Sequence, residues 1–371
     1  MRKLLQKWLT KPVMRLADKW SSRPDKARVF KALTDLHQEI LKGNTKKGLT
    51  IPFDIHQDKF IVLSDQHKGA KNDSDDFMLC EKNYLAALEY YYRNNYFFVN
   101  LGDCEELWEN TLAPVKKSNA ASFEKEKLFL QQNKYIKIFG NHDLYWGNDF
   151  ITAPAELKNI YGQSVTIYEG AILTTTIGNH AFQIFLTHGH QGDLQSDGNW
   201  FSKWFVSNVW AKLQAYLCIH PDTPAYDTQL KTAHNTMMYE WSSDNNVALI
   251  TGHTHQPVFE SLTLMERLYS RLAEAIKAKD EQAVEDIKAH IHHRFVKGEV
   301  LPDFTGFKPN YFNSGCCCFS DGDITGIEIA DGCIRLIKWE YDANGIPARM
   351  VLEEAPLEQV AVSVKTTITS E

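Results

Sequence analysis

The stretch FFVNLGD at residues 97–103 decides the fold, because a short apolar run ends abruptly at a glycine and a carboxylate. The same arrangement occurs at FIVLSDQH (60–67), YIKIFGNHD (135–143), FQIFLTHGH (182–190) and VALITGHTH (247–255). Short apolar runs that stop at polar clusters are typical of buried strands. Residues 75–95 have helical periodicity, which predicts a βαβ unit with parallel strands. Because the carboxyl ends of such strands meet at one edge of a sheet, we expect the polar clusters to converge on one crevice.

The composition limits the classes of protein that this chain can belong to. Its 371 residues, 43% hydrophobic and 23% charged, are typical of one large folded domain with insertions. The formal net charge of −7 argues against a nucleic-acid-binding scaffold, which needs a basic face. The seven cysteines show no zinc-ribbon spacing and indicate reduced thiols in a cytoplasmic protein. The sequence has no apolar run long enough for a membrane-spanning helix and no signal peptide, so we expect a protein that stays inside the cell.

We expect three parts along the chain. Residues 1–45 form a basic helical leader, residues 46–355 form the main domain, and residues 356–371 form a tail without regular structure. The main domain contains two predicted helical insertions, an aromatic-rich one at about 194–245 and a second at about 262–297. Near its end, the runs 324–330 and 333–341 predict a hairpin that closes a sheet.

The beginning of the leader supports two interpretations. Residues 1–28 carry nine Lys or Arg against two Asp, with Trp8, Trp20 and other apolar residues at near-helical spacing. A basic amphipathic helix of this kind is one description of a segment that lies on an anionic membrane surface, here through residues 1–24. The alternative is a helix that packs its apolar stripe on the main domain, and Pro12 interrupts it either way. The first interpretation predicts a cytoplasmic protein peripheral to the inner face of the membrane.

The strand ends supply the donor atoms that divalent metal ions need. Hard cations need carboxylate oxygens, borderline cations accept imidazole, and a dinuclear site needs a ligand that can bridge. Taken singly, an Asp at a strand end is usually a turn or helix cap, and a His is usually a surface or satisfied core residue. As an ordered set, the candidates support a metal site more strongly. The set consists of Asp65, His67, Asp103, Asn141, His188, His253 and His255.

At these residues the chain resembles the calcineurin-like metallophosphoesterase family, whose pattern runs DxH, GDxx(D/E), GNH(D/E), HG and GHxH. The five blocks occur in this order at Asp65–His67, Gly102–Glu106, Gly140–Asp143, His188–Gly189 and Gly252–His255. Each block alone is weak, but five of them after five predicted strands form a specific signal. The resemblance covers about residues 58–341. It implies an α/β (α+β) fold, a two-sheet β-sandwich flanked by helices, with helical insertions.

The resemblance also implies which ligands hold which ion, with Asp103 as the bridge. The remaining ligands divide into two sets, Asp65, His67 and His255 on one ion and Asn141, His188 and His253 on the other. We expect manganese first, although iron, zinc, cobalt and nickel, in divalent or mixed-valence pairs, tolerate the same donors. Two such ions activate a bridging water for in-line attack on phosphorus.

Catalytic roles follow for the residues beside these ligands. His142 follows a ligating Asn, which suits it to protonating the departing oxygen or stabilising charge there. Glu106 resembles the family carboxylate that orients this histidine, and Asp143 is a second candidate for that role.

Two neighbouring groups have open roles. The first group consists of His190, Asp193 and Asp197. Three roles are open for it: contact with the metal ligands from outside, contact with the aromatic insertion, or no role beyond that of ordinary loop residues. The second group, Cys316–Cys318, follows a turn that the family often places near the metals, and we interpret its thiols as buried small side chains and not as ligands.

The sequence therefore predicts a dinuclear hydrolase whose substrate is a phosphomonoester or phosphodiester. One alternative is a UDP-2,3-diacylglucosamine pyrophosphatase, because residues 102–108 and the aromatic insertion resemble that branch of the family. That branch carries Arg where this chain has His142. The other alternative is a non-catalytic scaffold that retains the metal site, although such proteins usually lose ligands and none is missing here.

Overall fold

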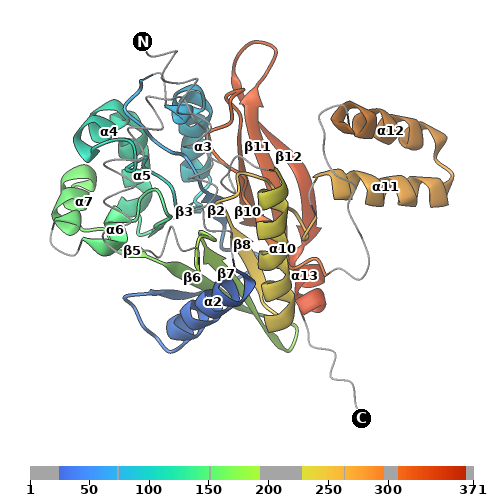
Figure 1. Ribbon diagram of the computed structural model, residues 1–371, viewed down its shortest axis with the longest axis horizontal. Helices are drawn as coiled ribbons and strands as arrows, with labels where there is room; N and C mark the ends of the chain where they lie inside the picture. The colour runs from blue at the N-terminus through green and yellow to red at the C-terminus, as the bar shows by residue number, and fades with distance from the viewer. Residues whose placement is uncertain are drawn as a thin grey trace, which may run out of the picture.

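Two packed β-sheets form the centre of the molecule (Figure 1). The computed structural model describes residues 25–72, 75–149, 152–192, 228–262, 264–295 and 308–364. The seven-stranded sheet has the order β12-β11-β10-β2-β3-β4-β5, and the five-stranded sheet has the order β1-β6-β7-β8-β9. Helices cover the outer faces of both sheets. The expected two-sheet sandwich flanked by helices is thus confirmed.

The strands range from two residues in β5 to ten in β12. The seven-stranded sheet contains β2 (Phe60–Leu63), β3 (Phe97–Leu101), β4 (Tyr135–Ile138), β5 (Ile167–Tyr168), β10 (Ile324–Ala330), β11 (Cys333–Tyr341) and β12 (Pro347–Pro356). The five-stranded sheet contains β1 (Gly48–Pro52), β6 (Gly170–Ile177), β7 (His180–Thr187), β8 (Ala248–Thr251) and β9 (Tyr311–Asn313). All five strands predicted from the apolar runs are present.

Parallel pairing places the polar strand ends together. β2, β3 and β4 pair in parallel, and so do β7 and β8 in the other sheet. The predicted connection between β2 and β3 consists of a 3-10 turn (Asp76–Leu79) and helix α3 (Glu81–Arg93). The carboxyl ends of all five strands therefore point to one edge of the sandwich, where the predicted metal ligands follow.

The core has three layers of apolar contacts. Between the sheets, Val62 and Val99 of one sheet lie in the same cluster as Leu186 and Ile250 of the other. Outside the seven-stranded sheet, α3 packs on the side chains that alternate to that face, such as Phe98. Outside the five-stranded sheet, α2 (Lys26–Leu41) and α10 (Thr228–Asn245) pack on a third cluster. Burying a large apolar side chain stabilises the fold by about 1.5–3 kcal/mol, so these layers hold the strand ends in place.

Helix α2 shows how local sequence produces this packing. The side chain of Asp25 caps its first turn by accepting from the N–H of Arg28 at 3.0 Å. Its buried residues recur every three or four positions and are Val29, Leu33, Leu36 and Ile40. Residues 26–41 were expected to belong to the leader, but they form an integral layer on the five-stranded sheet.

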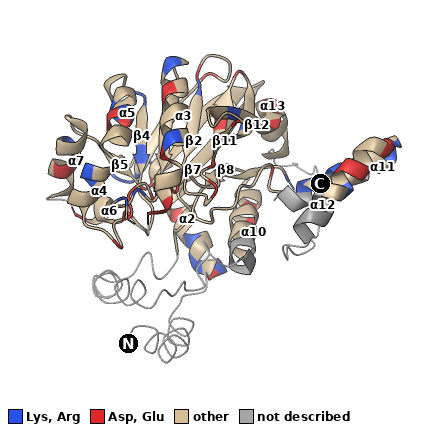
Figure 2. Cartoon of the chain, turned by 90° about the horizontal axis from the view of Figure 1, so that it is seen from above, with Lys and Arg blue, Asp and Glu red and all other residues tan. Residues whose placement is uncertain are grey.

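The remaining helices surround the seven-stranded sheet or project from the sandwich. Those near the sheet are α4 (Leu112–Ser118), α5 (Ala120–Gln131), α6 (Tyr145–Asn148) and α7 (Ala153–Tyr161). The second predicted insertion is a helical hairpin of α11 (Leu264–Ala278) and α12 (Glu281–Phe295), which projects from the sandwich and carries both charge signs (Figure 2). Arg267 of α11 joins it to Glu353 of β12 at 3.1 Å. Among the described helices, none combines the length and apolar character that crossing a bilayer requires.

The C-terminal region differs from the prediction. The hairpin of β10 and β11 is confirmed, but β12 extends it to three antiparallel strands. Residues after 355 were expected to lack regular structure, and this expectation is wrong for α13 (Leu357–Val364). Its buried residues, Leu357, Val360, Ala361 and Val364, have helical spacing, which the shortness of the segment concealed. The predicted leader segment 1–24 and the aromatic part of the first insertion, residues 193–227, lie outside the described residues.

Candidate metal centre

The structure brings all seven predicted metal ligands to one edge of the sandwich. Asp65 and His67 follow β2, Asp103 follows β3, and Asn141 follows β4. The other sheet contributes the residues after β7 and β8, which are His188, His253 and His255. All seven side chains are buried or nearly buried, although each has a polar or charged group. Buried polar groups at this density need partners, and a bound cation is one such partner.

The first predicted set of ligands forms a tight group of donor atoms. The Nε2 atom of His255 lies 3.3 Å from Oδ1 of Asp65 and 3.2 Å from Nε2 of His67. The same His67 nitrogen lies 3.9 Å from Oδ2 of Asp103. Atoms at these separations can all coordinate the same metal ion, so the group can hold one ion.

The second predicted set shares Asp103 with the first. Nε2 of His188 lies 3.2 Å from Oδ2 of Asp103 and 3.2 Å from Oδ1 of Asn141. Donor atoms of Asp103, His188 and His253 lie within 4.8 Å of one another. Because the Asp103 carboxylate borders both sets, it occupies the position that a bridging ligand needs.

The backbone at these ligands is strained. Five of the seven have positive φ, namely Asp65 (52°), His67 (49°), Asp103 (50°), His253 (70°) and His255 (55°). Each non-glycine residue in this conformation costs about 1–3 kcal/mol, and such residues cluster at functional sites. The strain turns side chains from alternate positions of one loop, such as His253 and His255, into the same site.

Two glycines allow the carboxylates to approach the loops. A Cβ atom at Gly140 would lie 2.2 Å from Oδ1 of Asp103, and one at Gly252 would lie 2.4 Å from Oδ2 of Asp65. Neither carboxylate could keep its position beside a larger residue. The glycines of the sequence blocks therefore have a steric role at the site.

The electrostatics of the group suit cation binding. Burial favours the neutral acid, but His188 and His142 hold the pKa of Asp103 well below its usual value. Burial holds the pKa of His253 well below its usual value, so this ring is neutral at pH 7. Its Nε2 atom is buried without a hydrogen-bond partner in the part of the chain that the structure describes. A neutral imidazole with a free, buried nitrogen fits a metal ligand, so the residues present fit the two ions that the donor set implies.

His142 lies beside the ligands, and one carboxylate oxygen of Glu106 contacts it. Oε2 of Glu106 lies 2.7 Å from Nδ1 of His142 and 2.8 Å from Nδ1 of His67. Burial lowers the pKa of His142, but Glu106 and Asp103 raise it to about 9. Burial alone raises the pKa of Glu106, yet His142 and His67 bring it to about 2. The pair is therefore a carboxylate and a protonated imidazole near pH 7.

Asp143 has a different position from the one expected for a residue that orients His142. Its carboxylate accepts from the backbone N–H of Gly140 at 2.6 Å and of Cys104 at 2.9 Å. These contacts fix the loops after β3 and β4 relative to each other. Glu106 is the carboxylate that contacts His142, so Asp143 acts on the loops and not on the ring.

Sequence reasoning missed two aromatic residues at the site. Trp108 stacks on His142, with ring centroids 4.1 Å apart and an angle of 21° between the planes. His234, on α10, lies with its ring 5.1 Å from that of His253, and its Nε2 lies 2.8 Å from the carbonyl oxygen of Gly189. The tryptophan, two residues beyond Glu106, could have been suspected, but nothing in the sequence distinguishes His234 from other helical histidines.

The residues with open roles are only partly described. His190 is 2% exposed, and its ring lies 5.3 Å from that of the proposed ligand His188. Asp193 and Asp197 lie outside the described residues. Cys316 and Cys317 are buried, as expected, whereas Cys318 is partly exposed and lies against His255.

Comparison with known proteins supplies one family match. A family model described as calcineurin-like phosphoesterase matches residues 58–257. No curated protein matches the sequence significantly. Among solved structures, vacuolar protein sorting 29 from Cryptosporidium parvum is 12% identical, covers 81% of this chain and 98% of its own, and superposes with a TM-score of 0.34. A putative 5'-nucleotidase from Staphylococcus aureus is 12% identical, with 80% of this chain and 54% of its own covered and a TM-score of 0.30.

Proposed function

Because this chain belongs to the calcineurin-like phosphoesterase family, we propose that it hydrolyses a phosphomonoester or phosphodiester with two metal ions bound between the ends of β2, β3, β4, β7 and β8. The observation that carries the proposal is the position of Asp103, whose carboxylate borders both groups of donor atoms. When bound, the two ions neutralise charge on the phosphate oxygens and lower the pKa of a water for attack on phosphorus.

The residues of the chain supply the remaining steps. Asp103 is held in place by the backbone N–H of His142, which donates to its Oδ1 at 2.7 Å. The protonated His142 ring donates a proton to the departing oxygen or stabilises the charge that develops there. Glu106 keeps that ring protonated and oriented, and the indole of Trp108 covers one of its faces.

The test is hydrolysis of p-nitrophenyl phosphate and its bis ester by protein loaded with Mn²⁺. Replacing His142 with Ala should lower kcat by about 100-fold, the usual contribution of a positioned proton donor. The Asp103→Asn variant should lose bound metal in addition to activity. His56→Ala is the matched control, because His56 is an exposed histidine outside the site and should leave the rate unchanged. Equal background rates for wild-type and His142→Ala protein would favour the non-catalytic scaffold.

The substrate class has one narrower candidate. The segment from Gly102 to Trp108 is similar to that of enzymes that hydrolyse the pyrophosphate of UDP-2,3-diacylglucosamine, and here its tryptophan covers the proposed proton donor. The presence of His142 where that branch carries Arg favours a simple phosphoester. Hydrolysis of UDP-2,3-diacylglucosamine at a kcat/KM well above that for the bis ester would establish the narrower assignment, and no detectable release of UMP would reject it.

A further inference from the structure

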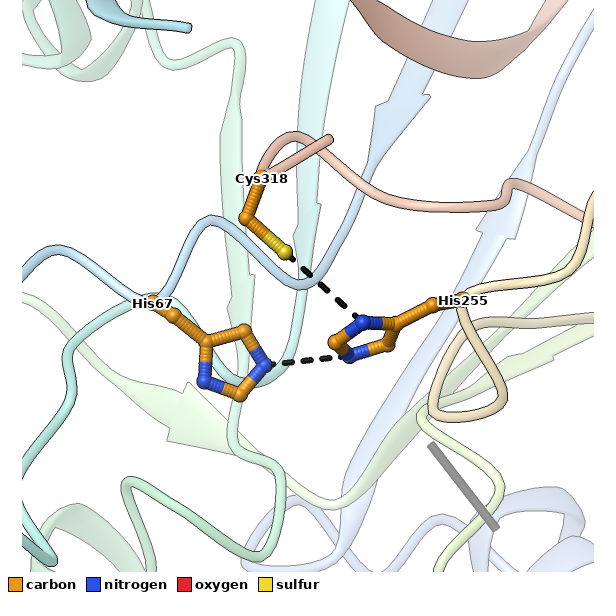
Figure 3. Close-up of side chains that lie close together, drawn as sticks. All are labelled: His67, His255 and Cys318. Atoms are coloured by element: carbon orange, nitrogen blue, oxygen red, sulfur yellow. Dashed lines mark hydrogen bonds between the residues drawn. The ribbon is translucent and has the colours of Figure 1, made fainter. Parts of the chain in front are cut away.

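The two ring nitrogens of His255 face different surroundings (Figure 3). Nε2 faces the candidate metal centre, 3.3 Å from Oδ1 of Asp65 and 3.2 Å from Nε2 of His67. Nδ1 lies 3.7 Å from Sγ of Cys318. The second ring nitrogen of His255 therefore has a sulfur atom as its neighbour.

A metal-binding histidine needs a partner at its second nitrogen. A neutral imidazole that binds through Nε2 carries its proton on Nδ1, and that N–H usually donates to a carboxylate, a carbonyl oxygen or water. The contact fixes both the tautomer and the orientation of the ring. At His255 the neighbouring acceptor is a thiol sulfur, which is a weak acceptor.

The loop that carries Cys318 is tied to the loop that carries the ligands. The N–H of Cys317 donates to the carbonyl oxygen of Asp65 at 3.1 Å, and the hydroxyls of Ser64 and Ser314 lie 2.7 Å apart. The thiol therefore has a fixed position relative to Asp65. Residues 314–318 also lie beyond residues 58–257, the part matched by the family model.

We propose that Cys318 is a positioning residue for the metal centre, whose sulfur accepts the Nδ1–H of His255 and thereby holds Nε2 toward Asp65. The inference rests on the metal site of the proposed function, although it does not require that the protein hydrolyse anything. Donor atoms of His67, His255 and Cys318 lie within 4.8 Å of one another, so direct ligation by the thiol is the alternative that the Co²⁺ spectrum described below tests.

The test is the affinity of metal-free protein for Mn²⁺, measured by titration calorimetry. Loss of such a supporting contact usually weakens metal binding by about 10- to 100-fold. We expect Cys318→Ala to weaken one of two Mn²⁺ sites by about 10-fold and Cys318→Ser, which retains an acceptor, to weaken it less. Cys333→Ala is the matched control, since this partly exposed thiol lies at the start of β11, away from the site, and both affinities should stay unchanged.

Three further measurements separate positioning from other roles. In a His255→Ala background, Cys318→Ala should have no additional effect on Mn²⁺ affinity, because the two residues act through one contact. Protein loaded with Co²⁺ should show no sulfur-to-cobalt charge-transfer absorption, whereas direct ligation by Cys318 would produce it. The melting temperature of metal-free Cys318→Ala should equal that of wild type, and a large decrease would indicate a purely structural role.

The outcomes distinguish this inference from the proposed function. If Cys318→Ala keeps both affinities within twofold of wild type, or loses as much in the His255→Ala background, the positioning role is wrong even in an active enzyme. If wild type binds two Mn²⁺ ions but hydrolyses no phosphoester, the proposed function fails, while a 10-fold loss in Cys318→Ala still supports the positioning role.

Discussion

At the scale of single residues, the protonation of His142 depends most strongly on the carboxylate of Glu106. Glu106 is the largest influence that raises the pKa of this histidine, which burial alone would lower. A raised pKa means that the protonated form is present below about pH 9 and is lost as the pH rises through that value. The proton that the proposed mechanism transfers is thus available at neutral pH because of Glu106.

The Glu106→Gln variant should therefore move the basic limb of the kcat profile to lower pH. Removing the negative charge of Glu106 leaves Asp103 to oppose the effect of burial on the pKa of His142. We therefore expect the limb to shift by about one unit or more and kcat to fall about 10- to 100-fold. The measurement is kcat for the bis ester from pH 6 to 10 at saturating Mn²⁺. An unchanged limb would show that His142 is not the group that titrates.

A second prediction concerns Gly140, where an added Cβ would lie 2.2 Å from the Asp103 carboxylate. The Gly140→Ala variant should lose Mn²⁺ affinity and about 100-fold in kcat, because the carboxylate proposed to bridge the two ions must move. Gly178→Ala is the control, since Gly178 also lies in a loop and has open space around it. It should cost about 1 kcal/mol of stability through its positive φ and leave the rate unchanged. Equal activity of Gly140→Ala and wild type would mean that Asp103 does not bridge.

At the scale of elements, a buried charge network supports the loop after β3. Nζ of Lys137, on β4, donates to both oxygens of Glu105 at 3.0 and 2.9 Å, and Lys68 lies 3.4 Å from the same carboxylate. Lys68 also donates to Glu126 of α5 at 2.6 Å. All four side chains are fully or almost fully buried. In the sequence, Glu105 lies between Asp103 and Glu106, and Glu106 contacts His142. The network therefore anchors the centre of the site.

Breaking one pair of this network should destabilise the fold. Lys137→Met leaves Glu105 with one cationic partner, and removing one partner of a buried ion pair typically costs about 3–5 kcal/mol. Adding Glu105→Gln should restore part of the loss, since the double variant leaves no unpaired charge at this position. Urea unfolding of the metal-free proteins measures both values. Single and double variants whose losses simply add would show that the two residues do not interact.

The sequence predicts the elements best where pattern and burial agree. The five apolar runs correspond to real strands, because parallel strands covered on both faces need continuous apolar residues. The sequence does not predict β12, because this strand lies at the edge of its sheet and exposes Met350, Val351 and Leu352. Exposed apolar residues on an edge strand do not alternate as a half-buried strand should, so the periodicity signal is lost.

The candidate site is likewise predicted where short motifs carry it. All seven proposed ligands come from the five blocks, and the structure brings them together. The contacts of Trp108, His234 and Cys318 depend on where the loop after β3, helix α10 and the loop after β9 pack, which is a tertiary property. The role of Asp143 could not be deduced for the same reason, because its partners are backbone N–H groups from two loops.

At the scale of the whole molecule, the remaining proposal is that residues 1–24 bind an anionic membrane surface. The basic residues of this segment give it a charge opposite to that of phosphatidylserine or phosphatidylglycerol, and each Lys or Arg near such a surface contributes about 1 kcal/mol. Full-length protein should sediment with phosphatidylglycerol vesicles at low salt and be released as salt screens the attraction. Deleting residues 1–24 should abolish sedimentation, and vesicles of phosphatidylcholine alone provide the control.

Because the metal ligands lie in the main domain, the deletion should leave hydrolysis of the soluble bis ester unchanged. Sedimentation that survives the deletion would favour the alternative, a helix that packs on the main domain.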